Sequence, residues 1–202
     1  TFKEKEIEGV CEPCQFRKQH RHPFPKERNV SKGLLDVVHY DVWGPAQMTT
    51  FGGCRYYVLF IDDLSRHTWI YPMQQKSEVF RHFQRFKNEV EKASGRQVQC
   101  LRLDGDKEYF SDDFMAYLKK EGIRREFTCR HTQQQNGVAK HKNWHILEVA
   151  WAMMNEKHMP KSYWAEAANT TFYLMNRCTT SGVHEVTLHE RYYGKKPDLS
   201  HT

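Results

Sequence analysis

The chain has 202 residues, 39% of them hydrophobic and 28% charged, with a net charge of +6 at pH 7. This composition is sufficient for one sizeable hydrophobic core. No apolar run approaches the roughly 20 residues that cross a bilayer, and the N-terminus lacks the apolar stretch of a signal peptide, so we expect a soluble, intracellular chain with no membrane partner.

The N-terminal segment carries Cys11 and Cys14, the one closely spaced pair among six cysteines. A Cys-x-x-Cys pair is half of a tetrahedral zinc site. His20 and His22 could complete the four ligands, although their spacing from the cysteines is unusual for zinc. The alternative that we favour is a partial zinc site followed by a basic linker, together covering residues 1–32.

The middle of the chain predicts strands near residues 34–42, 54–62 and 66–73, close enough in sequence to form an antiparallel meander. An amphipathic helix follows and ends at Gly95. Its apolar stripe predicts core packing rather than a ligand site, and it consists of Val79, Phe80, Phe83, Phe86 and Val90.

The second half predicts alternating strands and helices. We expect a strand over 98–103, a helix from Ser111 to Lys120, a strand over 123–128, a helix from Asn136 to about 157 and a last helix after Pro160. Antiparallel strands followed by alternating elements predict an α/β fold, a mixed five-stranded sheet with helices on both faces.

Two aspartates, Asp41 and Asp104, stand at or near the ends of predicted strands. Carboxylates that converge at a sheet edge can hold hard divalent cations, and a pair of such ions can activate a nucleophile and stabilise the leaving oxygen of a phosphodiester. The structural alternative is a turn former or helix cap. That alternative is preferred for Asp62 and Asp63, which we assign to a hairpin turn.

Five motifs in order resemble the integrase of copia-type retrotransposons. They span nearly the whole chain and are Asp41-Val-Trp-Gly-Pro45, Phe60-Ile-Asp-Asp-Leu-Ser-Arg66, Leu101-Arg-Leu-Asp104, Gln134-Gln-Asn-Gly-Val-Ala139 and Tyr163-Trp-Ala-Glu-Ala167. The resemblance implies a ribonuclease-H-like catalytic core over 33–180, a truncated zinc element before it and a C-terminal extension over 181–202. It also implies an Asp-Asp-Glu triad that holds Mg²⁺ or Mn²⁺ for DNA strand transfer.

The chain departs from this family at the third triad position. Asp41 and Asp104 match the first two members, but Lys140, 36 positions after Asp104, stands where the resemblance implies glutamate. An ammonium group repels the metal that a carboxylate would bind, so we expect catalysis to be impaired. The glycines that follow the second aspartate in the family are also replaced here, by Asp106 and Lys107.

The basic residues suggest a partner. We expect Lys140, Lys142, Arg124 and Arg125 to contact DNA phosphates, although a solvated basic face is an alternative for any one cluster. The resemblance implies DNA partners, both retroelement ends and target DNA, action in the nucleus and a possible homo-oligomer. Two rival functions remain open: a non-catalytic nucleic-acid-binding module that keeps the fold, and a metal-dependent nuclease with a different third ligand.

Overall fold

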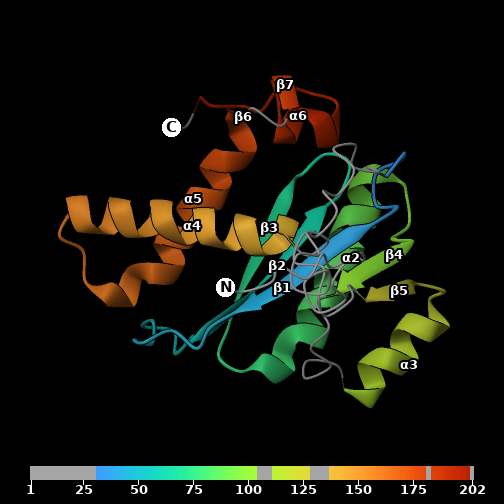
Figure 1. The fold of residues 1–202 in the computed structure, drawn as a ribbon, viewed down its shortest axis with the longest axis horizontal. Coiled ribbons are helices and arrows are strands. Elements are labelled where there is room, and N and C mark those ends of the chain that lie inside the picture. Colours follow the sequence, from blue (N-terminus) through green and yellow to red (C-terminus); the bar gives the residue numbers. More distant parts are fainter. Residues whose placement is uncertain (1–30, 104–110, 128–136, 181–182, 201–202) are drawn as a thin grey trace, which may run out of the picture.

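A five-stranded mixed sheet forms the centre of the computed structural model, which describes residues 31–103, 111–127, 137–180 and 183–200 (Figure 1). The strand order is β3-β2-β1-β4-β5, so β1 is the central strand. The strands are β1 (Val38–Trp43), β2 (Tyr56–Asp62), β3 (Thr68–Met73), β4 (Cys100–Leu103) and β5 (Arg124–Phe127).

The strand directions confirm the predicted mixed sheet. β1, β2 and β3 are successively antiparallel, whereas β4 runs parallel to β1 and β5 runs parallel to β4. Val38 is paired with Leu101 in the register between β1 and β4. The carboxyl ends of these two neighbouring strands therefore lie at the same edge of the sheet, as the sequence prediction for Asp41 and Asp104 required.

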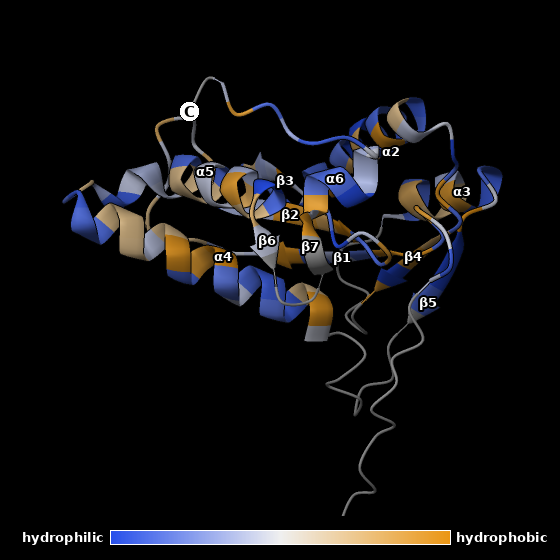
Figure 2. Cartoon of the chain, turned by 90° about the horizontal axis from the view of Figure 1, so that it is seen from above, coloured by the Kyte–Doolittle hydropathy of each residue, from blue (hydrophilic) through white to orange (hydrophobic). Residues whose placement is uncertain are grey.

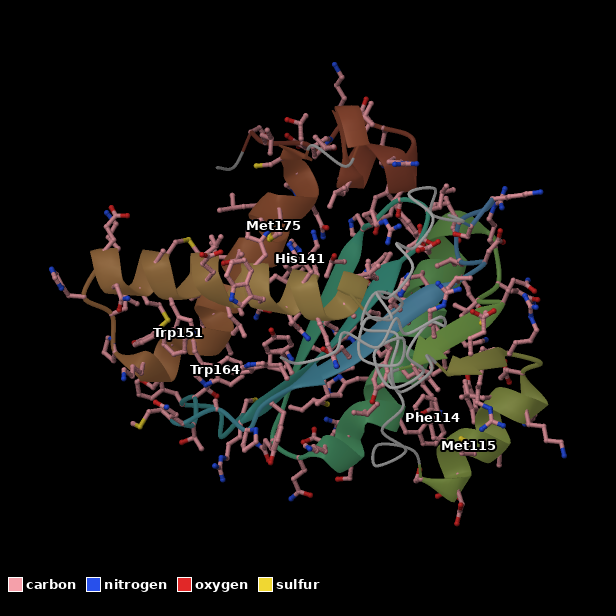
Figure 3. The ribbon with its side chains drawn as sticks, in the orientation of Figure 1. Phe114, Met115, His141, Trp151, Trp164 and Met175 are labelled. Atoms are coloured by element: carbon pink, nitrogen blue, oxygen red, sulfur yellow. The ribbon has the colours of Figure 1, made fainter. Side chains whose placement is uncertain are left out.

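Helices cover both faces of the sheet. α2 (Val79–Ser94), α3 (Asp112–Lys120) and α6 (Leu188–Tyr193) contribute to the first of two core clusters, and α4 (Gly137–Glu156) and α5 (Trp164–Arg177) to the second. α4 and α5 lie side by side (Figure 2). Phe114 of the first cluster and Trp164 of the second lie far apart in Figure 3. The remaining elements are the 3-10 helices η1 (Lys76–Glu78) and η3 (Lys161–Tyr163) and the hairpin β6 (Thr179–Thr180) and β7 (Val183–Thr187).

The two clusters follow from the period-2 alternation of β2. Val58 and Phe60 point into the first cluster, while Leu59 and Ile61 point into the second. Successive side chains of a strand point to opposite faces, so an uninterrupted apolar strand requires cover on both faces. The Phe60 ring stacks on Phe86 of α2 at 4.4 Å between centroids, which confirms core packing for the predicted stripe.

The ends of α2 and α3 are fixed by local chemistry. Gly95 follows α2 in the left-handed region, at φ 67°, and its N–H donates to the Glu91 carbonyl. This backbone conformation favours glycine. Ser111 caps α3 because its hydroxyl oxygen accepts the N–H of Phe114 at 3.2 Å. Both boundaries agree with the sequence prediction.

The edge strand β3 is tied to α5 by one side chain. Asn176 accepts the N–H of Thr68 at 3.1 Å and donates to the Thr68 carbonyl at 2.8 Å. The amide thus replaces a neighbouring strand at this point of the edge. Pro72 lacks an N–H at the other end of β3, so the edge offers few groups to another chain.

The C-terminal segment contributes to the first cluster through α6. Tyr192 is 4% exposed and its hydroxyl donates to the carbonyl of Val90 on α2 at 3.3 Å. The predicted extension over 181–202 therefore includes a helix packed on the core. Among the helices that the structure describes, none combines the length and apolarity required to cross a lipid bilayer.

Candidate active site

Asp41 lies near the carboxyl end of the central strand, on the face that α4 covers. Its side chain is half-buried. Tyr57, on the neighbouring strand β2, is fully buried close by, and burial together with the Asp41 carboxylate raises the pKa of the Tyr57 hydroxyl. Both effects disfavour ionisation of the Tyr57 hydroxyl, so Tyr57 stays protonated beside Asp41.

Asn143 of α4 holds the Asp41 side chain. Its amide Nδ2 donates to Asp41 Oδ2 at 2.5 Å, and Asn143 is 6% exposed. Sequence reasoning missed this residue. The available signal was a polar side chain on the otherwise apolar buried stripe of α4, with Ala139 and Ile146 on either side.

Lys140 lies in the first turn of α4 and is exposed. Residues three apart are neighbours on a helix surface, so Lys140 lies one turn before Asn143 on α4. Asp104 follows the last residue of β4 but, with the predicted cap Asn136, falls outside the described residues. The structure therefore describes Asp41 and Lys140 but not Asp104, and the predicted triad remains a prediction at all three positions.

The donors around Asp41 fit a hard cation only in part. The Asp41 carboxylate and the Asn143 amide oxygen are of the type that Mg²⁺ prefers, whereas the ammonium of Lys140 is not. In the part of the chain covered by the structure, no three His, Cys, Asp or Glu side chains come together as a metal site. Cys11 and Cys14, the predicted zinc half-site, lie outside that part.

Asp62 and Asp63 form the turn after β2, as predicted. Asp62 accepts the backbone N–H groups of Leu35 and Ser65, at 2.8 and 2.7 Å. Asp63 lies 2.7 Å from His39 Nε2 and 3.2 Å from the Arg66 guanidinium.

The Asp63 carboxylate of this turn is ionised. Burial by itself would raise the pKa of Asp63, but the hydrogen bonds from His39 and the Ser31 N–H, together with Arg66, hold the pKa well below its usual range. Burial lowers the pKa of His39 despite the neighbouring carboxylate. These groups stabilise the turn and leave no free carboxylate oxygen to serve the site near Asp41.

The predicted DNA contacts differ in exposure. Lys140, Arg124 and Arg125 are exposed, and Arg125 Nη1 lies 2.8 Å from the sulfur of Met115. Lys142 is half-buried, and burial and the nearby Arg66 lower the pKa of its amine to about 8. Lys142 is rotated about 200° from Lys140 around the α4 axis, so the two lysines leave the helix on nearly opposite sides.

An exposed face of α4 continues from Lys140. Trp144 is 61% exposed, and its ring lies 6.2 Å from that of His141. His145 and Glu148 extend the same face. We call the set Lys140, His141, Trp144 and His145 the α4 basic-aromatic face. An exposed tryptophan beside a lysine and two histidines is a suitable surface for stacking on a base and contacting phosphates.

Comparison with known sequences identifies the family. The chain is 42% identical over 167 residues, 83% of its length, to the retrovirus-related Pol polyprotein from transposon TNT 1-94 of Nicotiana tabacum. It is 31% identical over 188 residues, 93% of its length, to the Pol polyprotein from transposon RE2 of Arabidopsis thaliana. The chain belongs to the copia-type retrotransposon Pol family. It spans 13% of either relative's length, and no protein-family model matches it.

Solved structures confirm the ribonuclease-H-like fold of this Pol segment. The simian T-cell lymphotropic virus intasome in complex with the PP2A regulatory subunit B56 gamma aligns with a TM-score of 0.68 at 15% identity, covering 94% of this chain and 64% of that chain. The HTLV-2 integrase catalytic core domain in complex with magnesium aligns with a TM-score of 0.56 at 12% identity, covering 77% of this chain and 95% of that chain. At these identities the likeness concerns the fold alone.

Proposed function

We propose that this Pol segment is an integrase core that binds DNA and has lost most of its strand-transfer activity. The observation that carries the proposal is the position of Lys140, one turn before the Asn143 amide that bonds Asp41. The relationship to copia-type Pol polyproteins and the fold of the integrase cores support the DNA integration role. The cation at the third triad position supports the loss of activity.

The residues around Asp41 have different roles in the proposed site. Asp41 supplies a carboxylate oxygen, Asn143 orients it, and buried Tyr57 stays protonated beside it. Bound Mg²⁺, which the HTLV-2 integrase core structure contains, would supply Lewis-acid chemistry for phosphodiester attack. Lys140 opposes the accumulation of positive charge that this chemistry requires. Its positive charge instead attracts the phosphate backbone of DNA. The chain therefore keeps DNA binding while it loses strand-transfer activity.

A strand-transfer assay tests the catalytic part. The wild-type chain, Lys140→Glu and the control Lys157→Glu are compared with retroelement-end DNA and Mg²⁺ or Mn²⁺. Lys157 is a suitable control because it lies just after the other end of α4 with a side chain 73% exposed, so the charge change is equal but remote. We expect activity to rise in Lys140→Glu alone. Robust turnover by the wild-type chain would contradict the proposal.

A second candidate function, a non-catalytic nucleic-acid-binding module, is favoured by the α4 basic-aromatic face. It predicts that DNA affinity measured in EDTA falls in Lys140→Ala, with the salt dependence reduced by about one phosphate contact. Trp144→Ala is expected to weaken single-stranded DNA most, by ~1–3 kcal/mol for one stacked base. Unchanged affinity in both variants would remove DNA binding from the function of this face.

The nuclease alternative requires a different acidic ligand near Asp41. Within the described ranges no such cluster is present, and Asp62 and Asp63 are engaged in the turn after β2. The same Mg²⁺ assay, run with plasmid DNA, would reveal cleavage independent of retroelement ends if a nuclease site existed.

A further inference from the structure

The strand β5 forms one edge of the sheet, beside α3 (Figure 1). Among the described strands, only β4 pairs with β5. The N–H of Arg124 donates to the carbonyl of Gln99, the residue before β4, at 2.9 Å. Successive residues of a strand direct their backbone groups to opposite sides within the sheet, so the N–H and carbonyl of Arg125 point away from β4. Within the described residues, these two groups are available to a further strand.

A groove of about 690 Å³ lies between α3 and this edge. Its floor is apolar, since Ile123 is 5% exposed and Leu118 is fully buried. Arg125 is held on the α3 side by its contact of 2.8 Å with the sulfur of Met115, which Figure 3 labels on α3. A strand edge beside such a groove is suited to peptide binding by strand addition, in which backbone hydrogen bonds provide affinity and side-chain contacts provide specificity.

The charges at the groove favour an acidic occupant. Lys119, Arg124 and Arg125 line the groove and are exposed. Glu126 also lines it, but this carboxylate accepts two hydrogen bonds from the Arg102 guanidinium, at 2.7 and 3.0 Å. The same hydrogen bonds lower the pKa of Glu126, so this pair is ionised and neutral as a whole. The groove therefore presents the charges of its lysine and two arginines to an incoming segment.

A second copy of this chain is a poor occupant of the edge. Two β5 strands paired with each other would place the arginines of one copy beside those of the other, and like charges at paired positions are destabilising. DNA would use the cations but not the N–H and carbonyl of Arg125, whereas a peptide strand would use both. The opposite edge of the sheet is less suited to strand addition, because Asn176 occupies it at Thr68 and it contains Pro72.

We propose that the β5 edge binds an extended acidic segment of a partner protein as an additional strand of the sheet. The N–H and carbonyl of Arg125 bond the backbone of the segment. Adjacent strand residues point to opposite faces, so Arg124 and Arg125 attract carboxylates on the two faces of the added strand. Lys119 adds a third positive charge from α3. The inference goes beyond the proposed function, because this interaction requires neither metal nor DNA.

Peptide binding to the full chain tests the inference and is measured by fluorescence anisotropy in EDTA. The probe is a labelled peptide, EVEEVE, in which glutamates occupy both faces of a strand. The comparison peptides are the charge-reversed KVKKVK and an EVEEVE peptide N-methylated at its two central residues. N-methylation removes backbone donors in every register and keeps the charge. We expect EVEEVE to bind and KVKKVK not to bind, and N-methylation should weaken binding at least about tenfold.

Two variants at one position separate the charge from the backbone. Arg125→Ala removes the positive charge, and Arg125→Pro also removes the outward N–H, which β4 does not use. Proline is tolerated at such edge positions. We expect the affinity for EVEEVE to fall about two- to fivefold in Arg125→Ala and at least about fivefold further in Arg125→Pro. The control Arg191→Ala, at an exposed position of α6, should bind as the wild type does. Thermal unfolding identifies a variant that does not fold, and the N-methylated peptide then decides the question on the wild-type chain.

Four results would overturn the inference. The first is absence of EVEEVE binding at about millimolar peptide. The second is equal affinity for the N-methylated and unmodified peptides, which would show attraction by charge without strand addition. The third is a loss of duplex DNA affinity in Arg125→Ala with unchanged peptide affinity, which would assign the edge to DNA. The fourth is a dimer in sedimentation that Arg125→Pro dissociates, which would assign the edge to a second copy.

Discussion

Replacing Asn176 with alanine should destabilise the whole fold, because this side chain joins α5 to the edge of the sheet. It makes two buried hydrogen bonds with Thr68, which is 1% exposed. Asn176→Ala leaves the Thr68 N–H and carbonyl unpaired, at about 1–3 kcal/mol for each buried group. Partial entry of water into the vacated space reduces the sum. We therefore expect a loss of ~2–4 kcal/mol, a large part of a typical domain stability of about 5–15 kcal/mol.

The assay is urea denaturation followed by tryptophan fluorescence, with the free energy of unfolding extrapolated to water. Thr170→Ala, an exposed position of the same helix, is the control and should change stability by less than about 0.7 kcal/mol, in the stabilising direction, since alanine is the better helix former. A loss below about 1 kcal/mol in Asn176→Ala, with an unchanged denaturant slope, would refute the argument that this amide substitutes for a strand.

Three further predictions concern titration and capping. Burial lowers the pKa of His67 to about 3 from 6.5, so the unfolded chain binds a proton first and stability falls as pH drops from 6.5 toward 3. Between pH 6.5 and about pH 4.5, the free energy of unfolding should fall by about 2 kcal/mol less in His67→Phe than in the wild type. An equal fall in both proteins would contradict this. Lys142, with a folded pKa of about 8 against 10.5, should make wild-type stability rise with pH across that interval. Lys142→Met should remove this rise and increase the free energy of unfolding by roughly 1 kcal/mol at neutral pH. DNA affinity of the same variant, measured in EDTA, tests the predicted phosphate contact of Lys142. Ser111→Ala should cost ~1 kcal/mol by loss of the α3 cap, measured by thermal unfolding against the exposed control Ser77→Ala.

Patterning predicted the fold well because its signals are local. The Phe83 and Phe86 stripe predicted α2, Gly95 predicted its end, and the order of strands and helices predicted a mixed sheet covered on both faces. Each signal depends on side-chain period or on the backbone freedom of one residue. The packing of α6 on the core was not predicted, because its Tyr192 contact with α2 joins residues about a hundred positions apart.

The candidate site could be predicted only in its outline. Asp41 and Lys140 were identified from motifs, but Asn143 was not, since an asparagine inside a helix carries no signal for its partner. Lys142 was predicted from charge alone to contact DNA. The structure shows it half-buried with a lowered pKa of about 8, and charge patterning cannot distinguish such a lysine from a solvated one.

The sequence by itself determined the family, the strand and helix order and the replacement of the expected carboxylate by Lys140, because identity and spacing are properties of the chain. Only the tertiary structure decided which groups meet: Asn143 with Asp41, His39 with Asp63 and Asn176 with Thr68. These contacts depend on the register of β1 and on the position of α4 and α5 over the sheet. Residues that are distant in sequence interact strongly only when packing brings them together and removes the water between them.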